Sequence, residues 1–239
     1  MYIKMKNAII LCSGGLDSVV TAYYVKNKLN YDNLKFLFFN YDQRTFGWEK
    51  KAVEFFCSQL KGEIIEVKLE WLGLISDSLI NNSKSVVETT EGLKNTKEES
   101  DRYYVPFRNG IFLSQAISLA DSLFVRDNEV WDIFVGFKCE GQEPFPDATS
   151  EFVKAMNNLM KVGKVKGRII APLIEKDKED IVLLGKELDV DLSKTYSCYI
   201  GNLDGQHCGK CLACRLRRAG FKWANVEDDT EYIEREDIR

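Results

Sequence analysis

Short runs of apolar residues alternate with segments of helical spacing through the first part of the chain. Residues 7–12, 34–39 and 64–67 are apolar runs without polar alternation, whereas residues 16–29 and 48–60 carry apolar positions at helical intervals. Strands that lack polar alternation are buried on both faces. Strands separated by helices form βαβ units, whose strands are parallel. The pattern therefore predicts an α/β protein with a parallel sheet and helices on both faces.

The later part of the chain continues this alternation after a polar interruption. Residues 81–104 are polar, and we expect either a lid or a surface excursion there. A long helix is predicted over 109–123, followed by a strand over 131–136 and helices over 152–160 and 178–188. The order of elements is therefore that of one large α/β domain.

Composition and charge exclude several classes of protein. The chain has 239 residues, of which 45% are hydrophobic and 29% are charged, a globular composition rather than a disordered one. Its net charge of −4 does not indicate a nucleic-acid coat or a membrane-surface protein. No apolar run is long enough for a membrane span, and the N-terminus does not have the layout of a signal peptide. We therefore expect a cytoplasmic protein.

A glycine-containing turn joins the first predicted strand to the first predicted helix. It reads Ser13-Gly14-Gly15-Leu16-Asp17-Ser18. Two glycines allow a sharp bend whose N–H groups point to one spot, and the helix N-terminus adds partial positive charge. The serine hydroxyls can donate hydrogen bonds, and Asp17 can help to hold a magnesium ion. Because the turn lacks the Gly-Lys-Ser/Thr ending of a Walker loop, it predicts phosphate binding without γ-phosphate transfer.

Four of the seven cysteines are clustered near the C-terminus. Cys208, Cys211 and Cys214 have Cys-x-x-Cys-x-x-Cys spacing, and Cys198 precedes them. Four thiolates can close a tetrahedron around a structural zinc ion and leave no position for a catalytic water. An iron–sulfur cluster uses the same ligands and stays an alternative. His207 is expected at the surface or behind the ligands rather than as a ligand.

The loop resembles the pyrophosphate loop of the N-type ATP pyrophosphatases (the PP-loop superfamily), and further motifs narrow the resemblance. Residues 40–44, 104–109 and 171–173 are similar to the family segments Asn/Asp-Tyr-Gly-Gln-Arg, Val-Pro-x-Arg-Asn and Pro-Leu. Residues 197–217 are similar to its zinc-binding tail. Over residues 7–221 the chain resembles the 7-cyano-7-deazaguanine synthases (QueC). The resemblance implies a Rossmann-like sheet of the PP-loop type with a C-terminal four-cysteine zinc segment.

The resemblance also implies a reaction and its cofactors. Family members cleave ATP between its α and β phosphates, adenylate the carboxylate of 7-carboxy-7-deazaguanine and release pyrophosphate. Ammonia then gives the amide, and a second ATP drives dehydration to the nitrile. ATP, Mg²⁺ and Zn²⁺ are therefore the expected cofactors, and a homodimer is the expected assembly.

Candidate site residues follow from the same motifs. Arg44, Arg108 and Lys178 are expected to stabilise the negative charge that builds up on the phosphates. An aromatic ring can stack on the purine-like substrate, and a carboxylate can accept hydrogen bonds from its N–H groups. The expected substrate-binding residues are Asn109, Phe145 and Asp147.

Three places depart from the family pattern. Asp42 replaces a glycine, Thr45 replaces a histidine, and residues 141–149 lack the usual Asp, Ser-Gly and Cys-Arg. Two enzymatic hypotheses follow. One is an ordinary nitrile-forming synthase. The other is a QueC-like paralogue that couples the activated acyl group to another amine, such as a protein N-terminus, in an antiviral or modification system.

A third hypothesis, outside enzymology, is a zinc-containing nucleotide-binding module that binds RNA or DNA. Its basic residues would be Lys210, Arg215, Arg217, Arg218 and Lys222. The rival interpretation, which we favour, is that the Arg-Leu-Arg-Arg run is a solvated helix face. The expected divisions of the chain are an α/β domain over 1–190, a zinc segment over 191–226 and a frayed, solvated acidic tail over 227–239.

Overall fold

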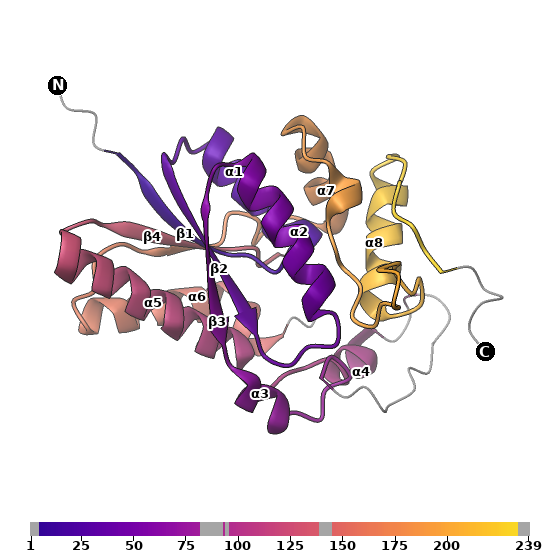
Figure 1. Ribbon diagram of the computed structural model, residues 1–239, viewed down its shortest axis with the longest axis horizontal. Helices are drawn as coiled ribbons and strands as arrows, with labels where there is room; N and C mark the ends of the chain where they lie inside the picture. Colours follow the sequence, from indigo (N-terminus) through magenta and orange to yellow (C-terminus); the bar gives the residue numbers. More distant parts are fainter. Residues whose placement is uncertain (1–4, 82–92, 94–95, 139–144, 234–239) are drawn as a thin grey trace.

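The computed structural model describes residues 5–81, 93, 96–138 and 145–233 of the chain. These residues form a central sheet with helices on both sides, and the cysteine-rich C-terminal segment lies at one end of the molecule (Figure 1). Within the described ranges, no helix has both the length and the apolar character that a membrane crossing requires. The predicted α/β architecture is confirmed.

The strands of the sheet are β1 (Asn7–Leu11), β2 (Asn33–Asn40), β3 (Glu63–Lys68), β4 (Trp131–Val135) and β5 (Ile169–Ile170). They are parallel and lie in the order β3-β2-β1-β4-β5. The chain moves outward from β1 to β3 and then crosses to the other side at β4. The carboxyl ends of β1 and β4 therefore flank a switch point of the topology, which is where open α/β sheets bind ligands.

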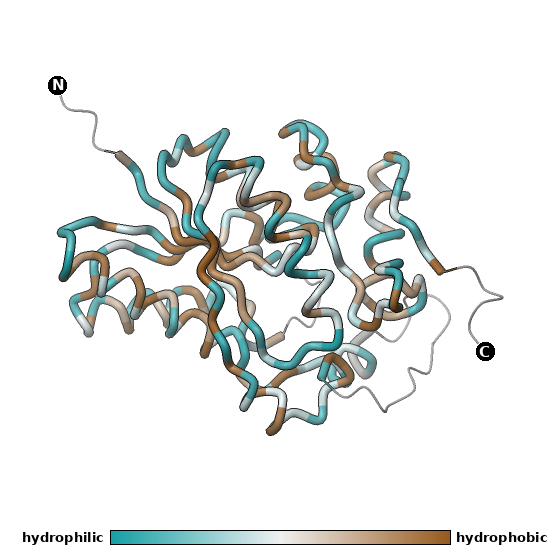
Figure 2. Tube along the Cα trace, in the orientation of Figure 1, coloured by the Kyte–Doolittle hydropathy of each residue, from teal (hydrophilic) through white to brown (hydrophobic). Residues whose placement is uncertain are grey.

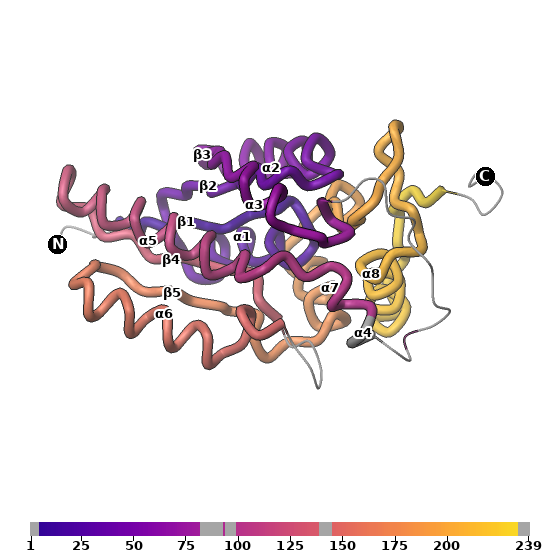
Figure 3. The backbone as a smooth tube through the Cα atoms, turned by 90° about the horizontal axis from the view of Figure 1, so that it is seen from below, coloured from indigo at the N-terminus to yellow at the C-terminus, as the bar shows by residue number. Residues whose placement is uncertain are grey.

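Helices cover both faces of this sheet. α1 (Leu16–Asn27), α2 (Phe46–Gln59) and α7 (Lys178–Glu187) lie on one face, and α5 (Arg108–Asp127) and α6 (Ser150–Val162) lie on the other. α8 (Leu212–Trp223) packs on α7 at the end of the molecule, with α4 (Thr96–Asp101) beside it (Figure 3). The remaining elements are α3 (Glu70–Leu74) and two 3₁₀ turns at Pro146–Ala148 and Leu192–Lys194.

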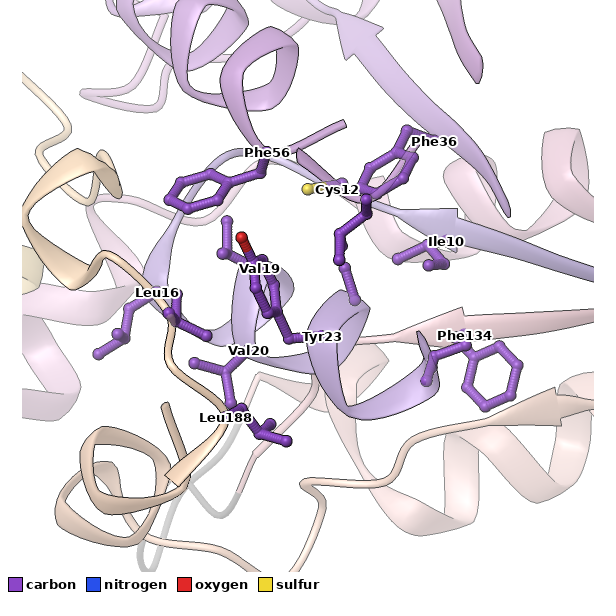
Figure 4. Packing of buried hydrophobic residues seen from close by; sticks show 14 of the residues in the cluster. Ile10, Cys12, Leu16, Val19, Val20, Tyr23, Phe36, Phe56, Phe134 and Leu188 are labelled. Carbon is purple, nitrogen blue, oxygen red and sulfur yellow. The ribbon is translucent and has the colours of Figure 1, made fainter. Parts of the chain in front are cut away.

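Alternate residues of the central strand show how two cores form around one sheet. Ala8 and Ile10 pack with α1, α2 and α7, whereas Ile9 packs with α5 and α6. Side chains of a strand point alternately to its two faces, so an unbroken apolar run supplies both cores. Figure 2 shows this concentration of apolar residues along the strands, and Figure 4 shows Tyr23 of α1 beside Phe56 of α2 in the first core. The predicted burial of the strands on both faces is confirmed.

The sequence pattern did not predict β5, α3 or α4. These elements contain 2, 5 and 6 residues, which is too few to display a hydrophobic period. β5 is recognisable only through its parallel pairing with β4, which brings Ile169 beside Ile133. Such pairing is a property of the folded chain and not of the local sequence.

The expectation of a frayed tail is wrong for residues 228–233, although the acidic residues Glu227, Asp229 and Glu231 are exposed as expected. Thr230 is buried, and Tyr232 donates a hydrogen bond to the Asp228 carboxylate at 2.6 Å. The backbone N–H of Ile233 donates to the carbonyl of His207 at 2.9 Å. The tail packs because these groups find partners beside the cysteine cluster, which a count of its acidic residues does not show.

Candidate functional site

A cavity of about 700 Å³ lies at the carboxyl ends of β1 and β4. The loop after β1, the segment 136–138 after β4 and the first residues of α5 line it on the sheet side. Residues 196–199 and one face of α8 line it from the C-terminal part of the chain. Its volume lies within the range of natural small-molecule sites. The topology and the cavity therefore indicate the same place for ligand binding.

The loop after β1 has the backbone geometry of an anion site. Gly14 has a φ of +77°, and a Cβ at this position would lie 2.7 Å from the carbonyl oxygen of Glu49. Gly15 caps α1 without a side-chain hydrogen bond, so the first N–H groups of the helix are available to a ligand. The lining residues of the loop are Ser13, Gly15, Leu16, Asp17 and Ser18. Gly14 shapes the loop from behind, against α2.

Two residues after β4 were missed by sequence reasoning. A Cβ on Gly136 would lie 2.9 Å from the backbone nitrogen of Ser18, so this glycine allows β4 to approach the loop closely. Lys138 lines the cavity and is buried. Their place directly after a predicted strand was the available signal, because strand carboxyl ends bind ligands in this type of sheet.

Lys178 and Asp17 form an ion pair at the loop. The Lys178 Nζ atom lies 2.7 and 2.8 Å from the two carboxylate oxygens of Asp17, and both residues line the cavity. Lys178 begins α7 and Asp17 lies in the first turn of α1, so two helix N-termini meet here. The structure thus places the predicted cation beside the predicted phosphate loop. A magnesium ion held by Asp17 would share its carboxylate with Lys178.

Arg108 supplies a second cation to the lining of the cavity. Its Nη1 atom donates to the Tyr41 hydroxyl at 3.1 Å, and its guanidinium lies 5.4 Å from the Tyr41 ring centroid and 6.0 Å from that of Phe112. Burial raises the pKa of Tyr41 to about 12, so the phenol is neutral and acts as an acceptor. Arg108 is therefore held between aromatic rings, where its delocalised charge is accommodated.

The three predicted substrate residues divide into two that line the cavity and one that lies behind them. Asn109 and Phe145 line it, and the Phe145 ring stacks with Tyr104 at 6.0 Å between centroids. Asp147 is buried and accepts hydrogen bonds from the backbone N–H of Asn109 at 2.9 Å and from its side-chain amide at 3.3 Å. In this arrangement Asp147 orients Asn109, and its role in substrate binding stays a prediction.

The structure does not bring Arg44 to the other predicted cations. Arg44 does not belong to the residues that line the cavity, and its backbone N–H donates to the carbonyl of Ile80 at 2.9 Å. A catalytic role for Arg44 stays a prediction. The sequence departures at 141–144 lie outside the described residues.

Glu49, another residue that sequence reasoning missed, is a buried carboxylate that lines the cavity. Its Oε1 atom accepts from the Thr45 hydroxyl at 2.6 Å, and its Oε2 atom accepts from the Gln43 side-chain amide at 3.1 Å. Burial raises the pKa of Glu49, while these two hydrogen bonds and the charge of Arg108 act in the opposite direction. Thr45, which departs from the histidine of the family pattern, therefore donates to this carboxylate.

The four clustered cysteines converge on one point. Their Sγ atoms all lie within 4.8 Å of one another, and all four residues are buried. The Cys198 and Cys211 sulfurs are 4.0 Å apart and those of Cys208 and Cys214 are 3.9 Å apart. Tetrahedral coordination with metal–sulfur bonds of about 2.3 Å requires sulfurs about 3.8 Å apart. The Gly201 N–H donates to Cys198 Sγ at 3.1 Å, which favours a thiolate. These residues fit a closed, structural metal site.

Arg217 corrects the expectation of a solvated helix face on α8. Its side chain is 1% exposed, and its Nη1 atom donates to the Thr195 hydroxyl at 2.6 Å. Its Nη2 atom donates to the Leu192 carbonyl at 2.7 Å, and its Nε atom donates to the Thr230 hydroxyl at 3.0 Å and faces Asp228. The expectation is wrong for Arg217 because α8 turns this side chain toward the tail and the cavity lining.

Arg215 and His207, two neighbours of the cysteine cluster, both have interaction partners inside the protein. Arg215 is paired with the buried carboxylate of Glu99 from α4, whereas Arg218 is exposed. His207 is buried rather than at the surface, and its Nε2 atom accepts from the Ser197 N–H at 3.0 Å. Burial, with the nearby Arg217 guanidinium, lowers the pKa of His207 to about 4, so the ring is a neutral acceptor.

Comparison with known proteins places this site in a family. The family model described as "Queuosine biosynthesis protein QueC" matches residues 7–225. The 7-cyano-7-deazaguanine synthase of Methanosphaera stadtmanae is 36% identical over 94% of this chain and 97% of its own length. The corresponding enzyme of Methanocaldococcus jannaschii is 38% identical over 95% of this chain and 99% of its own.

Likeness to solved structures is much weaker. An NMN synthetase from Francisella tularensis has a TM-score of 0.41 and 16% sequence identity, with 93% of this chain and 85% of that chain covered. A likeness of this extent supports no conclusion about the site. The family match, by contrast, spans the loop, the cavity lining and the cysteine cluster, and the chain belongs to the QueC family.

Proposed function

We propose that the protein adenylates the carboxylate of 7-carboxy-7-deazaguanine with ATP and converts the product, with ammonia and a second ATP, into 7-cyano-7-deazaguanine. This chain covers almost the full length of the relatives that carry this enzyme name. The observation that carries the proposal is the shared cavity. The loop residues, Lys178 and Arg108 all border the same space as Asn109 and Phe145.

The loop and its cations would bind the phosphates of ATP. In the first step a carboxylate oxygen of the substrate attacks the α-phosphorus, and pyrophosphate leaves. The α1 N-terminus and Lys178 lie where negative charge would collect, and both charges are fixed before the substrate binds. Mg²⁺ bound with the phosphates would neutralise further charge, and Asp17 offers it a carboxylate.

The remaining steps would pass the acyl group to nitrogen. Ammonia attacks the carbonyl carbon of the acyl adenylate, and AMP leaves with the bridging oxygen. A second ATP then adenylates the amide oxygen, and loss of that oxygen with AMP and of two protons from nitrogen gives the nitrile. The reactive adenylate must be shielded from water. The cavity lining contributed by Tyr199, Leu212 and Leu216 is the apolar surface that would do so.

We also propose that the four cysteines hold Zn²⁺. Four buried thiolates in a closed tetrahedral arrangement suit zinc and leave no coordination position for substrate. When bound, the ion would hold Cys198 and the start of α8, which both line the cavity. Metal analysis of the purified protein tests the assignment, and iron in place of zinc would contradict it.

A second candidate function is a QueC-like paralogue that couples the activated acyl group to another amine. One observation favours it. Where the family pattern has Cys-Arg, Ala148 lines the cavity and Thr149 caps α6 by accepting a hydrogen bond from the Phe152 N–H at 3.0 Å. At this position the arginine of the family pattern is therefore replaced by a threonine that caps a helix, and Ala148 contributes no charge to the cavity lining.

One experiment separates the two functions. The purified protein is incubated with ATP, 7-carboxy-7-deazaguanine and ammonia, and the products are followed by mass spectrometry. Nitrile at a turnover typical of family members would support the synthase and contradict the paralogue. AMP and pyrophosphate without nitrile would contradict the synthase. A matched K178M variant controls for contaminating activity, because its residue borders the phosphate loop.

A further inference from the structure

We propose that Glu49 accepts the proton of the amine that attacks the activated carboxyl group. The inference rests on the proposed function, since it assigns one step of that reaction to a particular side chain. Attack by an amine on an acyl adenylate leaves a positively charged nitrogen. That nitrogen must lose a proton before the amide is stable, and a carboxylate in the cavity can take it.

The charges around the cavity single out this residue. Among the described residues that line the cavity, the carboxylates are those of Asp17 and Glu49. Both oxygens of Asp17 are bound by the Lys178 ammonium group, so this carboxylate is engaged by a cation at the loop. Glu49 is bound by the neutral donors Thr45 and Gln43. Of the two, Glu49 is therefore the carboxylate whose hydrogen-bond donors, a hydroxyl and an amide, carry no charge.

Position supports the same assignment. The first turn of α2 lies directly behind the phosphate loop, since a Cβ on Gly14 would come within 2.7 Å of the Glu49 carbonyl oxygen. The Glu49 side chain lines the cavity, and its charge interacts with Tyr41 and Arg108. Phosphates on the loop and a substrate ring near Asn109 would leave the reacting carbon between them, in the cavity that Glu49 also lines.

The carboxylate is also held in a fixed orientation. Gln43, which donates to Glu49, is itself fixed by donating to the Phe39 carbonyl at 2.9 Å and by accepting from the Tyr41 N–H at 2.9 Å. Thr45 is 1% exposed. A proton acceptor that is oriented before the substrate arrives loses little freedom in the transition state.

The surroundings adjust the basicity of Glu49. Burial raises the pKa of this carboxyl group above its usual value, and Thr45, Gln43 and Arg108 limit the rise. The titratable groups that face it are Tyr41, Arg108 and Tyr196. The first and last are phenols whose pKa is raised by burial, so they are neutral near neutral pH. Glu49 is thus the carboxylate in this set, facing one guanidinium and two neutral phenols.

The proposed step balances as follows. The amine nitrogen forms a bond to the carbonyl carbon of the acyl adenylate, and the bond between that carbon and the bridging oxygen breaks. AMP leaves with the bond's electron pair. One N–H proton passes to the Glu49 carboxylate and later to solvent. No oxidant, reductant or further reactant is required.

The test compares the two half-reactions in wild type and E49Q. Adenylate formation is measured as pyrophosphate released in one turnover without amine. Acyl transfer is measured with hydroxylamine, a weakly basic amine that is largely neutral at neutral pH, by mass spectrometry of the hydroxamate. Because Glu49 acts only on the amine, E49Q is expected to keep pyrophosphate release within about threefold and to lose about 100-fold in hydroxamate formation. When the rate is expressed per neutral hydroxylamine, the wild-type rate is expected to fall as pH decreases through the Glu49 pKa, and this fall is absent in E49Q.

A second variant guards against a purely structural effect. T45V removes a hydrogen bond to the charged carboxylate, which raises its pKa, so the acidic fall in hydroxamate formation is expected to move to higher pH while pyrophosphate release is kept. Equal losses of both half-reactions in E49Q, or an unchanged hydroxamate rate, would overturn the inference. A wild-type protein that releases no pyrophosphate with this acid would instead overturn the proposed function, and the inference with it.

Discussion

The two sides of the cavity are built in different ways. The loop side, residues 13–18 with Lys178, depends on the backbone geometry of two glycines and on one ion pair at the ends of two helices. The cysteine side, residues 196–199 and 212–217, depends on four converging thiols and on a buried arginine with partners in three segments.

The difference indicates which side of the cavity keeps its shape without the metal and the tail. The loop side is attached directly to β1, whose neighbours on both sides are strands of the sheet. The cysteine side has no strand of the sheet in it and is joined to the rest through α8, α4 and the tail. We therefore expect the loop side to keep its shape when the metal or the tail is lost, and the cysteine side to lose it.

Metal removal is expected to have the largest effect, because it should unfold the cysteine side and leave the loop side intact. A chelator or C211S is expected to release the ion and open residues 198–216 to protease, with a loss of several kcal/mol of local stability on the cysteine side. Limited proteolysis with mass spectrometry locates the cuts. C57A, which alters a buried cysteine of α2 outside the cluster, is the matched control and is expected to keep the metal. Cuts spread through the sheet would contradict the division into two sides.

The loop side is tested by removing its cation. K178M is expected to lower the rate of adenylate formation by about 100- to 1000-fold, because a charge aimed at the developing negative charge is lost. Pyrophosphate release measures the effect. K186M, on the exposed side of the same helix, is the control and is expected to change the rate little. The melting temperature of K178M is expected to stay near that of wild type, since the α7 contacts remain. A similar loss in K186M would count against a specific role for Lys178.

Sequence reasoning succeeded where function depends on neighbouring residues. The groups of the phosphate loop are all placed by one strand, one turn and one helix that follow each other in the chain. The thiols of Cys208, Cys211 and Cys214 are likewise placed by one short segment. The βαβ order likewise follows from local periodicity, and it determined the parallel sheet and the position of the cavity.

The rest depends on contacts between distant segments. In the local sequence Glu49 is an ordinary helix residue, and only the packing of α2 against the loop places it beside the cavity. Arg217 lies in a run of basic residues, and nothing local distinguishes it from the exposed Arg218. Its burial requires Thr195, 22 residues away, and Thr230, 13 residues away. A local pattern cannot show whether a charged side chain will meet such partners.

This pair of adjacent arginines gives a sharper test of the cysteine side. R217M is expected to destabilise the protein by about 3 kcal/mol, because it leaves Asp228 and two threonine hydroxyls without their buried partner. R218M removes an exposed guanidinium that lies over the Tyr232 ring, and it is expected to cost less than about 1 kcal/mol. Urea unfolding measures both. Equal effects of the two substitutions would show that the buried network does not determine the stability of this side.

The smallest expected effect concerns the pH dependence of the tail. Burial alone would raise the pKa of Asp228, but the Arg217 guanidinium and hydrogen bonds from Thr230 and Tyr232 hold this pKa below its usual value. A carboxyl group with a lowered pKa stabilises the folded state above its unfolded pKa of about 3.9, and this contribution is lost as the pH falls.

D228N is therefore expected to lower the free energy of unfolding by about 1 kcal/mol at neutral pH and by almost nothing at a pH below the folded pKa. The value at neutral pH is small because the group is partly exposed to solvent. Urea unfolding of wild type and D228N at a series of pH values measures the difference. D229N, which alters the exposed neighbour, is expected to show no such pH dependence. A difference between wild type and D228N that grows as the pH falls would have the wrong sign for an ion pair. It would show that the tail is held to α8 by its hydrogen bonds and packing, and not by the charge of Asp228.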